Sequence, residues 1–347
     1  MTDFEPPLRL ILDGEALASN WQALNARSGS APAGAAVKAN GYGIGARDVV
    51  TRLRDAGCRD FFVAHWGEAA AIADIILPEW ISVLNGIHER DIPRVRALGA
   101  VPVLNTPEQV SMWQASGGGR CHIMFDSGIN RLGIGPEQMA QCDLRSMDID
   151  LLLSHLASAD EDSAQNNAQQ LLFQEQMALT GTRRHSLANS AGIMLGADYH
   201  YDLTRPGLGL YGGIARPGME AFIKPVARLS ARLLQVRTLA AGTSIGYNAT
   251  HLCRDVTTVG TISIGYADGY LRAFSSKGNA YHGEVVLPVL GRVSMDLLTI
   301  DISAAPELRE GDWVDVDYNL PTASALTGLS QYELLTNLGT RFERIWR

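Results

Sequence analysis

The sequence predicts an α/β plus all-β protein, in which an N-terminal (β/α)8 barrel of the TIM type precedes a C-terminal domain of β-strands. Three observations support this prediction. The length of 347 residues suits two domains or one large barrel with an addition, since domains usually hold about 100–200 residues. Short apolar runs alternate with longer segments of helical periodicity over the first two thirds of the chain. From about Lys224, runs rich in valine and threonine replace this alternation.

Eight apolar runs in the first part of the chain are predicted as the barrel strands. They are 34–38, 61–66, 80–85, 101–104, 122–126, 149–155, 184–188 and 202–205. Helical periodicity fills the intervals, as in 47–56, 106–115 and 163–179. Eight successive strand–helix units favour a closed barrel over an open sheet.

Five β-branched runs in the last third of the chain are predicted as strands of the second domain. They are 233–239, 256–264, 284–290, 297–302 and 312–316. The apolar segment 8–12 precedes the first predicted helix at 15–27, and the barrel has eight strands without it. We therefore expect 8–12 to cross over and pair with the β domain. The predicted domains are a barrel over 12–226 and a β domain made of 1–11 and 227–347.

Composition narrows the class of protein. Apolar residues make up 46% of the chain and charged residues 19%, and the formal net charge is -8. No run of lysine or arginine offers the basic stripe that binds nucleic acid. No apolar run reaches the roughly 20 residues of a membrane span, and the first ten residues do not resemble a signal peptide. We therefore expect a cytoplasmic protein that binds neither nucleic acid nor membranes.

The cysteines do not indicate a disulfide framework or a metal site. Cys58, Cys121, Cys142 and Cys253 are scattered, without a CxxC pair or a histidine at zinc-finger spacing. Such spacing is typical of structural thiols in a reducing compartment, so no metal is expected.

Polar residues stand at the ends of several predicted barrel strands. They are Lys38 at the end of strand one, Arg131 after strand five, His155 at the end of strand six, Asn189 and Ser190 after strand seven, and Arg205 at the end of strand eight. In (β/α)8 barrels the loops after the strands form one face, where functional side chains cluster. We therefore expect these residues to share one mouth of the barrel.

The strand-end residues suggest a class of cofactor. An amine such as Lys38 in an apolar setting can have a lowered pKa and attack a carbonyl group, although a lone lysine here also fits a side chain that reaches solvent. Taken singly, His155 fits a structural histidine and Arg205 an ion-pair arginine. Ser190 and the glycine-rich stretch 207–209 offer a hydroxyl and open backbone N–H groups to a phosphate. A lysine, a phosphate site and space for an aromatic ring describe a pyridoxal phosphate pocket.

Five sequence blocks resemble the alanine racemase family. They are AVKANGYG at 36–43, DSGINRLG at 126–133, RPGLGLYG at 205–212, IGYADG at 264–269 and GRVSMD at 291–296. The blocks occur in the family's order, so the resemblance covers essentially the whole chain. It implies a pyridoxal 5'-phosphate barrel followed by a β domain, which is the division that the sequence pattern also predicts.

The resemblance implies roles for individual barrel residues around pyridoxal 5'-phosphate. Lys38 is the lysine that binds the cofactor, Tyr42, Ser190, Gly207 and Leu208 hold its phosphate, Asn189 and Tyr211 lie close by, Arg131 lies near its phenolic oxygen, and Arg205 faces the pyridine nitrogen with His155 behind it. Because a guanidinium keeps its proton near neutral pH, Arg205 would leave the ring a weaker electron sink and limit transamination.

The resemblance also implies a homodimer with shared active sites. Tyr266 and Met295 would come from the second subunit, and Tyr247 would lie on the access route of the amino-acid substrate, which Arg131, Met295 and Tyr247 contact. Lys38 and Tyr266 would act as the two bases that interconvert L- and D-alanine, the D form serving peptidoglycan synthesis. A tyrosine base needs nearby positive charge, and His155 or a cofactor-side arginine is the expected source.

One departure from the family and three alternatives remain. Many members carry a carbamylated lysine that orients the arginine corresponding to Arg131, but Met124 stands at that position here. A thioether carries no negative charge, so Arg131 must be oriented in another way. The alternatives are a broad-specificity or serine racemase on the same scaffold, an amino-acid decarboxylase on that scaffold, and a non-catalytic protein that binds pyridoxal phosphate. The catalytic cysteine and acidic motif of such decarboxylases are not found, and Tyr266 favours a racemase.

Overall fold

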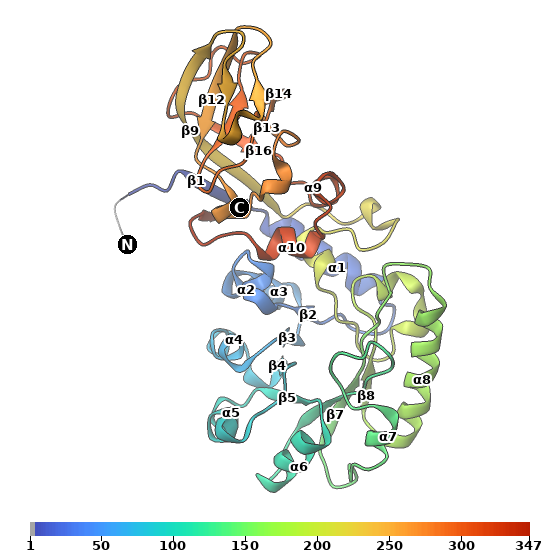
Figure 1. Cartoon of the computed structure of the whole chain (residues 1–347). Coiled ribbons are helices and arrows are strands. Elements are labelled where there is room, and N and C mark those ends of the chain that lie inside the picture. Colours follow the sequence, from blue (N-terminus) through green and yellow to red (C-terminus); the bar gives the residue numbers. More distant parts are fainter. Residues whose placement is uncertain (1–3) are drawn as a thin grey trace. The chain divides into compact units, whose positions relative to one another are not determined.

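The structure is a computed structural model that describes residues 4–347, apart from the side chain of Leu179. It divides into two compact units. One is Ala16–Lys224, and the other combines the described part of the first 15 residues with Pro225–Arg347. Residues 1–3 of the predicted β domain lie outside the described residues. The structure places helices around the outside of the strands in the first unit, which we call the barrel unit (Figure 1).

The barrel unit contains a parallel sheet of seven strands in the order β2-β3-β4-β5-β6-β7-β8. The strands are β2 (Ala35–Ala36), β3 (Phe61–Val63), β4 (Ile81–Val83), β5 (Val101–Leu104), β6 (Cys121–Met124), β7 (Ile149–Leu153) and β8 (Arg184–Ser186). Seven of the eight predicted strands are therefore confirmed, although most are shorter than predicted. Their order in space follows their order in the chain, as expected of successive strand–helix units.

The eighth predicted strand, 202–205, is not a regular strand, but it fills the gap between β8 and β2. Its backbone bonds are Asp202 N–H to His185 O and Arg205 N–H to Ala188 O on the β8 side, and Thr204 N–H to Pro32 O and Gly34 N–H to Thr204 O on the β2 side. A single parallel bridge joins Ala33 to Thr204. Pro206 follows directly and has no N–H with which to extend the ladder. The sheet thus closes through an irregular segment.

One helix precedes the first barrel strand, and the others lie between or after the strands. They are α1 (Gly14–Arg27), α2 (Lys38–Tyr42), α3 (Ala46–Ala56), α4 (Trp66–Ala70), α5 (Ile92–Leu98), α6 (Pro107–Ala115), α7 (Pro136–Met139) and α8 (Ala164–Thr180). Local signals explain several starts: the Thr106 hydroxyl accepts the Gln109 N–H before α6, with Pro107 in the first turn, and the Ser163 side chain caps α8. The predicted helices 47–56, 106–115 and 163–179 are confirmed within one residue at each end.

Side chains fill the interior of the barrel. Phe62, Val103, Met124, Leu151, Leu153 and Leu203 form one buried cluster, contributed by β3, β5, β6, β7 and the closing segment. A larger apolar cluster includes strand residues such as Ile123 and Leu152 and residues of the covering helices such as Phe173. The interior is therefore a packed core rather than a channel, and it leaves the strand ends to carry function.

The second unit, which we call the β unit, is built around the 13-residue strand β9 (Ala227–Leu239). The other strands are β1 (Leu8–Leu12), β10 (Ser244–Ile245), β11 (His251–Leu252), β12 (Thr257–Ile262), β13 (Asn279–His282), β14 (Val285–Pro288), β15 (Leu298–Asp301), β16 (Trp313–Val316) and β17 (Glu343–Trp346), with helices α9 (Leu320–Thr327) and α10 (Gln331–Thr336). β9 pairs with β1, β12 and β16. The prediction that 8–12 pairs with the β domain is confirmed, since β1 also runs parallel to β17.

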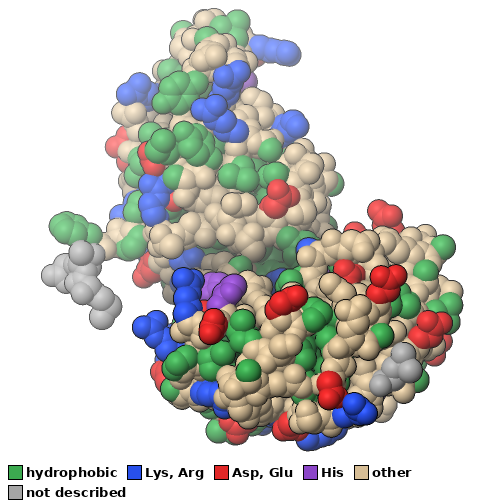
Figure 2. Space-filling view, turned by 60° about the horizontal axis from the view of Figure 1, so that its bottom comes forward, with side chains coloured by type: hydrophobic (Ala, Val, Ile, Leu, Met, Phe, Trp, Pro, Cys, Tyr) green, Lys and Arg blue, Asp and Glu red, His purple; other side chains and the backbone are tan. Residues whose placement is uncertain are grey.

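Two general features concern the surface and the helices. Acidic and basic side chains are both spread over the face shown in Figure 2. Within the part of the chain that the structure describes, none of the helices combines the length and the apolar character needed to cross a bilayer.

Candidate active site

Lys38 stands at the start of an unusual turn at the end of β2. The next four residues all have left-handed backbone angles, with φ of 53° at Ala39, 55° at Asn40, 63° at Gly41 and 52° at Tyr42. A left-handed conformation costs an L-residue about 1–2 kcal/mol, so a run of three non-glycine residues is expensive. Such a run persists only where its surroundings fix it, and strained backbone of this kind is common at functional sites.

Contacts from several elements hold this turn. The Asn40 Oδ1 atom accepts the Ala46 N–H at 3.0 Å, and the Gly43 N–H donates to the Ala39 carbonyl at 2.8 Å. The Tyr42 ring stacks on Tyr211, with ring centroids 4.5 Å apart. The carboxylate of Glu68, in α4, accepts the Ala39 N–H at 2.7 Å. The turn that follows Lys38 is therefore fixed by contacts from α3, from α4 and from Tyr211.

Cationic side chains from separate strand ends surround Lys38. Burial lowers the pKa of Lys38, the charges of Arg131 and Arg205 lower it further, and Glu68 acts in the opposite direction. Burial also lowers the pKa of Arg205 to about 10, so its guanidinium stays charged at neutral pH. Among the described residues, no carboxylate forms an ion pair with Lys38, Arg131 or Arg205. The cluster therefore has positive charge to offer to an anionic ligand.

Arg205 does not form an ion pair with another described residue, and His155 does not carry a charge at neutral pH. The Arg205 guanidinium donates to the Ser186 hydroxyl and to the Ser154 carbonyl, which are both neutral. Burial, followed by the charges of Arg205, Arg131 and Lys38, lowers the pKa of His155 to about 3. His155 is thus neutral at physiological pH, and it cannot supply the positive charge that we expected it to offer Tyr266.

A cradle of small residues and hydroxyl groups lies beside the Lys38 turn. The Ser190 Oγ atom accepts the Gly207 N–H at 2.9 Å and the Gly209 N–H at 3.1 Å. A Cβ atom at Gly207 would collide with the Tyr42 hydroxyl, so only glycine fits there. Tyr211, in the 3-10 helix Leu208–Tyr211, donates its hydroxyl to the Ala36 carbonyl at 2.8 Å.

The structure brings most of the predicted barrel residues to the carboxyl ends of the strands. The contacts above link five of these residues, either directly or through the effect of one charge on another. They are Lys38, Tyr42, Ser190, Arg205 and Gly207. Asn189 lies beside Ser190, but its side chain accepts the Gly192 N–H at 2.8 Å and so also stabilises its own loop. Leu208 is buried. Arg131 is exposed at the surface of its loop.

Met124 lies in an apolar environment, unlike the charged group that many family members carry at this position. Its side chain is 8% exposed and belongs to the apolar cluster inside the barrel. A Cβ atom at Gly133 would lie 3.1 Å from the Met124 Cγ atom and 2.9 Å from the Asp126 N atom, so the loop that carries Arg131 returns closely over β6. Asp126 Oδ1 accepts the Gly128 and Asn130 N–H groups. Backbone turns built on Asp126 therefore shape the Arg131 loop.

Tyr247, Tyr266 and Met295 lie in the β unit. Tyr266 begins a short 3-10 helix, Tyr266–Asp268, and donates its N–H to the Ser294 carbonyl at 3.0 Å, while the Ala267 N–H donates to Met295 at 3.0 Å. Tyr266 and Met295 are therefore neighbours within this unit. Met295 is 53% exposed and Tyr247 is 61% exposed, so neither fills the core of this unit.

Two contacts of charged groups with the 3-10 helix Tyr266–Asp268 were not identified from the sequence. The Arg272 guanidinium lies 5.3 Å from the centroid of the Tyr266 ring, where a cation is attracted to the ring face. Arg341 pairs with both oxygens of the fully buried Asp268, at 2.7 and 2.8 Å. The short spacing between Tyr266 and Arg272 in the sequence could have indicated their contact. Nothing in the sequence indicates that Arg341 pairs with Asp268.

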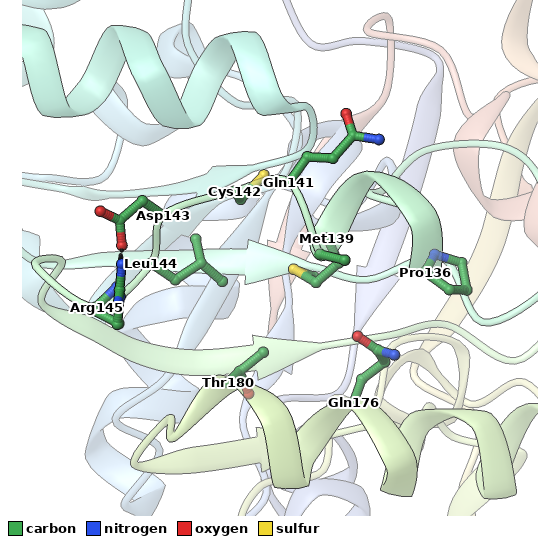
Figure 3. A pocket seen from close by; sticks show the side chains of 10 residues that line it. Pro136, Met139, Gln141, Cys142, Asp143, Leu144, Arg145, Gln176 and Thr180 are labelled. Atoms are coloured by element: carbon green, nitrogen blue, oxygen red, sulfur yellow. Dashed lines mark hydrogen bonds and ion pairs between the residues drawn. The ribbon is translucent and has the colours of Figure 1, made fainter.

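A separate cavity does not belong to this site. It has a volume of about 520 Å³ and lies among α7, the following segment and the end of α8, with Met139, Cys142, Leu144 and Gln176 in its lining. Figure 3 shows Asp143 and Arg145 paired with each other beside it. Its charged groups are thus mutually satisfied, in contrast to those around Lys38.

Comparison with known proteins finds one family throughout. The model of the alanine racemase N-terminal domain matches residues 12–215, and that of the alanine racemase C-terminal domain matches residues 226–346. The biosynthetic alanine racemase of Agrobacterium fabrum is 40% identical, over 98% of this chain and 94% of its own length. An alanine racemase of Cereibacter sphaeroides is 41% identical, over 96% of this chain and 97% of its own.

Solved structures agree with the sequence relatives. The crystal structure of alanine racemase from Bartonella henselae, with covalently bound pyridoxal phosphate, superposes with a TM-score of 0.91 at 33% identity, covering 99% of this chain and all of that one. The biosynthetic alanine racemase of Pseudomonas aeruginosa superposes with a TM-score of 0.90 at 32% identity and similar coverage.

Proposed function

The chain belongs to the alanine racemase family, and we propose that it is a pyridoxal-phosphate-dependent isomerase that interconverts L- and D-alanine. The observation that carries this proposal is the placement of Lys38. Its side chain is half-buried at a strand end, burial lowers its pKa, and its cationic neighbours have no carboxylate partner among the described residues. This setting suits an amine that bonds to an aldehyde and a pocket that receives a phosphate.

The residues of the mouth fit pyridoxal phosphate. Lys38 would hold it covalently; Tyr42, Ser190, Gly207 and Leu208 would hold its phosphate; Asn189 and Tyr211 would support that pocket; Arg131 would meet its phenolic oxygen; and Arg205, with His155 behind it, would meet its ring nitrogen. When bound, the cofactor supplies an electron sink that makes the α-hydrogen of an amino acid acidic. The missing Cβ at Gly207 and the cationic surplus are the features of this structure that favour the assignment.

The side chains of Lys38 and Tyr266 would move the α-proton of the substrate. A lowered pKa increases the fraction of Lys38 that is neutral, so its amine can accept the α-proton on one face of the substrate and return it. The Tyr266 phenol would serve the opposite face, and the Arg272 guanidinium lies 5.3 Å from the centroid of its ring. Arg131, Met295 and Tyr247 would contact the substrate.

Arg205 would tune this chemistry rather than take part in the proton transfer. A buried guanidinium with neutral partners remains a hydrogen-bond donor at neutral pH. It would therefore leave the ring nitrogen without a full proton, which weakens the electron sink and favours racemisation over transamination.

The assembly and the cellular role are further parts of the proposal. We infer a cytoplasmic homodimer in which Tyr266, Met295 and Tyr247 of one subunit complete the site of the other. The barrel over 12–226 would bind the cofactor, and the segments 1–11 and 227–347 would serve the partner's site. The D-alanine that it forms would enter peptidoglycan. Sedimentation of the active enzyme measures the dimer directly, and a fully active monomer would contradict this part.

Incubation of the loaded enzyme with L-alanine in deuterated water tests the proposal. We expect D-alanine to appear with deuterium at Cα, measured by chiral chromatography and NMR, because the α-proton exchanges with solvent between the two bases. In Tyr266→Phe, racemisation should fall by about 10²–10⁴-fold, the range that general acid–base groups contribute. Turnover of serine or bulkier amino acids but not alanine would correct the substrate. A loaded protein without turnover of any amino acid would instead be a non-catalytic carrier.

A further inference from the structure

Glu68 is an acidic residue of the barrel unit that joins two loops at the mouth. It lies in the first turn of α4, and its side chain is 18% exposed. The Oε1 atom accepts the Ala39 N–H at 2.7 Å, and the Oε2 atom accepts the Ala64 N–H at 2.7 Å. Ala39 directly follows Lys38, and Ala64 directly follows β3. One carboxylate therefore ties the Lys38 turn to the neighbouring strand.

The bond to Ala39 falls where the backbone most needs support. Ala39 is the first of the four left-handed residues after Lys38, and its φ of 53° is unfavourable for an alanine. Hydrogen bonds to a charged acceptor are stronger than those between neutral groups. Loss of the acceptor would therefore let the turn relax and would move the Lys38 amine, whose position depends on that turn.

The charge of Glu68 also matters for Lys38. The charged groups that face the amine are Arg131 from the loop after β6, Arg205 from the closing segment and Glu68 from α4, while His155 after β7 is neutral. Glu68 alone is negative among these groups of the described chain. His65 lies beside it, with Nε2 4.0 Å from Oε1, but its side chain is 60% exposed. Glu68 thus opposes the two arginines.

A simpler role would be to cap α4. Glu68 is the third residue of that helix, a position at which glutamate side chains often reach back to the backbone before the helix. The Ala64 bond fits this role, but the Ala39 bond does not, because Ala39 belongs to a different loop. The bond outside the helix is therefore the one that needs a further explanation.

We propose that Glu68 is a positioning residue for Lys38, which fixes the turn that carries the amine and balances the two arginines around it. The importance of this role for catalysis rests on the proposed function of Lys38. The effect on the amine itself does not, so it can be measured whether or not the protein is a racemase.

The test compares Glu68→Gln with wild type and with a matched variant, Glu108→Gln. Glu108 also lies in the first turn of a barrel helix, α6, but it is exposed and bonds to Thr106. The full-length protein, freed of cofactor with hydroxylamine, is labelled with a trace of acetic anhydride at a series of pH values. Peptide mass spectrometry then gives the pH at which Lys38 is half labelled.

Removal of a negative charge disfavours the ammonium form, so Glu68→Gln should label at a pH lower by about one unit. In the loaded enzyme, kcat should fall by about tenfold with its acid limb shifted the same way, since small misplacements of a reacting group slow the reaction. Glu108→Gln should match wild type in both measurements. Glu68→Ala adds loss of the acceptor, and thermal unfolding identifies any variant that has lost its fold.

The outcomes separate the two proposals. If Glu68→Gln labels Lys38 as wild type does and keeps its kcat, the positioning role is wrong, even if the protein racemises alanine. If wild type has no racemase activity but the labelling of Lys38 still shifts in Glu68→Gln, the proposed function fails and the assignment of Glu68 stands.

Discussion

The two ends of the barrel differ in whether their charged side chains form ion pairs with each other. At the amino ends of the strands, Asp150 accepts hydrogen bonds from Arg120 at 2.7 Å and from Arg184 at 2.8 Å, and Arg184 also reaches Asp60 at 3.0 Å. At the carboxyl ends, Lys38, Arg131 and Arg205 have no ion pair with a carboxylate among the described residues. One end is balanced within the chain, and the other carries a surplus of positive charge.

The difference shows in the titration of the groups. At the amino ends, burial alone would raise the pKa of Asp150, but hydrogen bonds from Arg184 and Arg120 lower it to about 2. At the carboxyl ends, burial lowers the pKa of both Lys38 and Arg205 without a bonded carboxylate to oppose it. Loss of one partner from a balanced cluster leaves an uncompensated charge and destabilises the barrel, whereas an unbalanced cluster is kept at a cost in stability and suits an anionic ligand.

The largest expected effect is the loss of activity in Lys38→Met. Racemisation should fall by at least about 10³-fold, because the variant lacks the amine that binds the cofactor and serves as one base. The free energy of unfolding of the cofactor-free protein should not fall, since a buried cation without a bonded partner has been removed. Urea unfolding measures this, with Lys277→Met in the β unit as the control. A strongly destabilised Lys38→Met would show that the mouth is also a structural cluster.

The second prediction concerns the opposite end. Asp150→Asn should destabilise the fold by about 3–5 kcal/mol, because it removes the largely buried negative charge that Arg120 and Arg184 share. Its kcat per folded, loaded molecule should equal that of wild type. Asp74→Asn is the matched control: its pair with Arg47 is exposed, so it should cost at most about 1 kcal/mol. Equal costs for the two variants would mean that the amino-end cluster is not stabilising.

The contrast between the ends was only partly predictable from the sequence. Lys38, Arg131 and Arg205 could be identified because each follows an apolar run, and the carboxyl ends of parallel strands meet at one face. The amino-end cluster could not be identified from the sequence, because Asp60 and Arg184 lie 124 positions apart and charged residues before strands are common. Glu68 resembles an ordinary helix-start glutamate, and only the fold brings it to Ala39. The apolar pattern identified the closing segment 202–205, but it did not predict that the backbone of this segment is irregular.

The third prediction places a carboxylate at the mouth. Arg205→Glu should slow racemisation and raise the transamination side reaction by about tenfold, because an acid beside the ring nitrogen stabilises its protonated form, which is the stronger electron sink. Transamination is followed by pyruvate formation from alanine. An unchanged rate would mean that Arg205 does not face the ring nitrogen. Arg184→Glu at the opposite end should destabilise the fold without any change in the reaction partition.

The smallest expected effect uses the pH dependence of two histidines, the half-buried His155 at one end and the buried His122 at the other. Burial lowers the pKa of His155 at the mouth and of His122, beside Asp150, Arg120 and Arg184, to about 3 in each case. The unfolded chain has an ordinary value near ~6.5 and takes up these protons first. Each histidine therefore reduces stability as the pH falls from about 6.5 towards 3, by at most about 2 kcal/mol at pH 5. His155→Gln and His122→Gln should each remove part of this loss.

Loading with pyridoxal phosphate then separates the two histidines. An anion at the mouth offsets the field of Arg205, Arg131 and Lys38, so the pKa of His155 should rise and its contribution to the acid loss should shrink. His122 faces a cluster that is already balanced and should contribute the same amount with and without the cofactor. Urea unfolding of both variants at pH 7.5 and pH 5, each with and without pyridoxal phosphate, measures the four differences. If the cofactor changes the contribution of His122 as much as that of His155, the two ends are coupled through the barrel core and cannot be regarded as separate structural and functional ends.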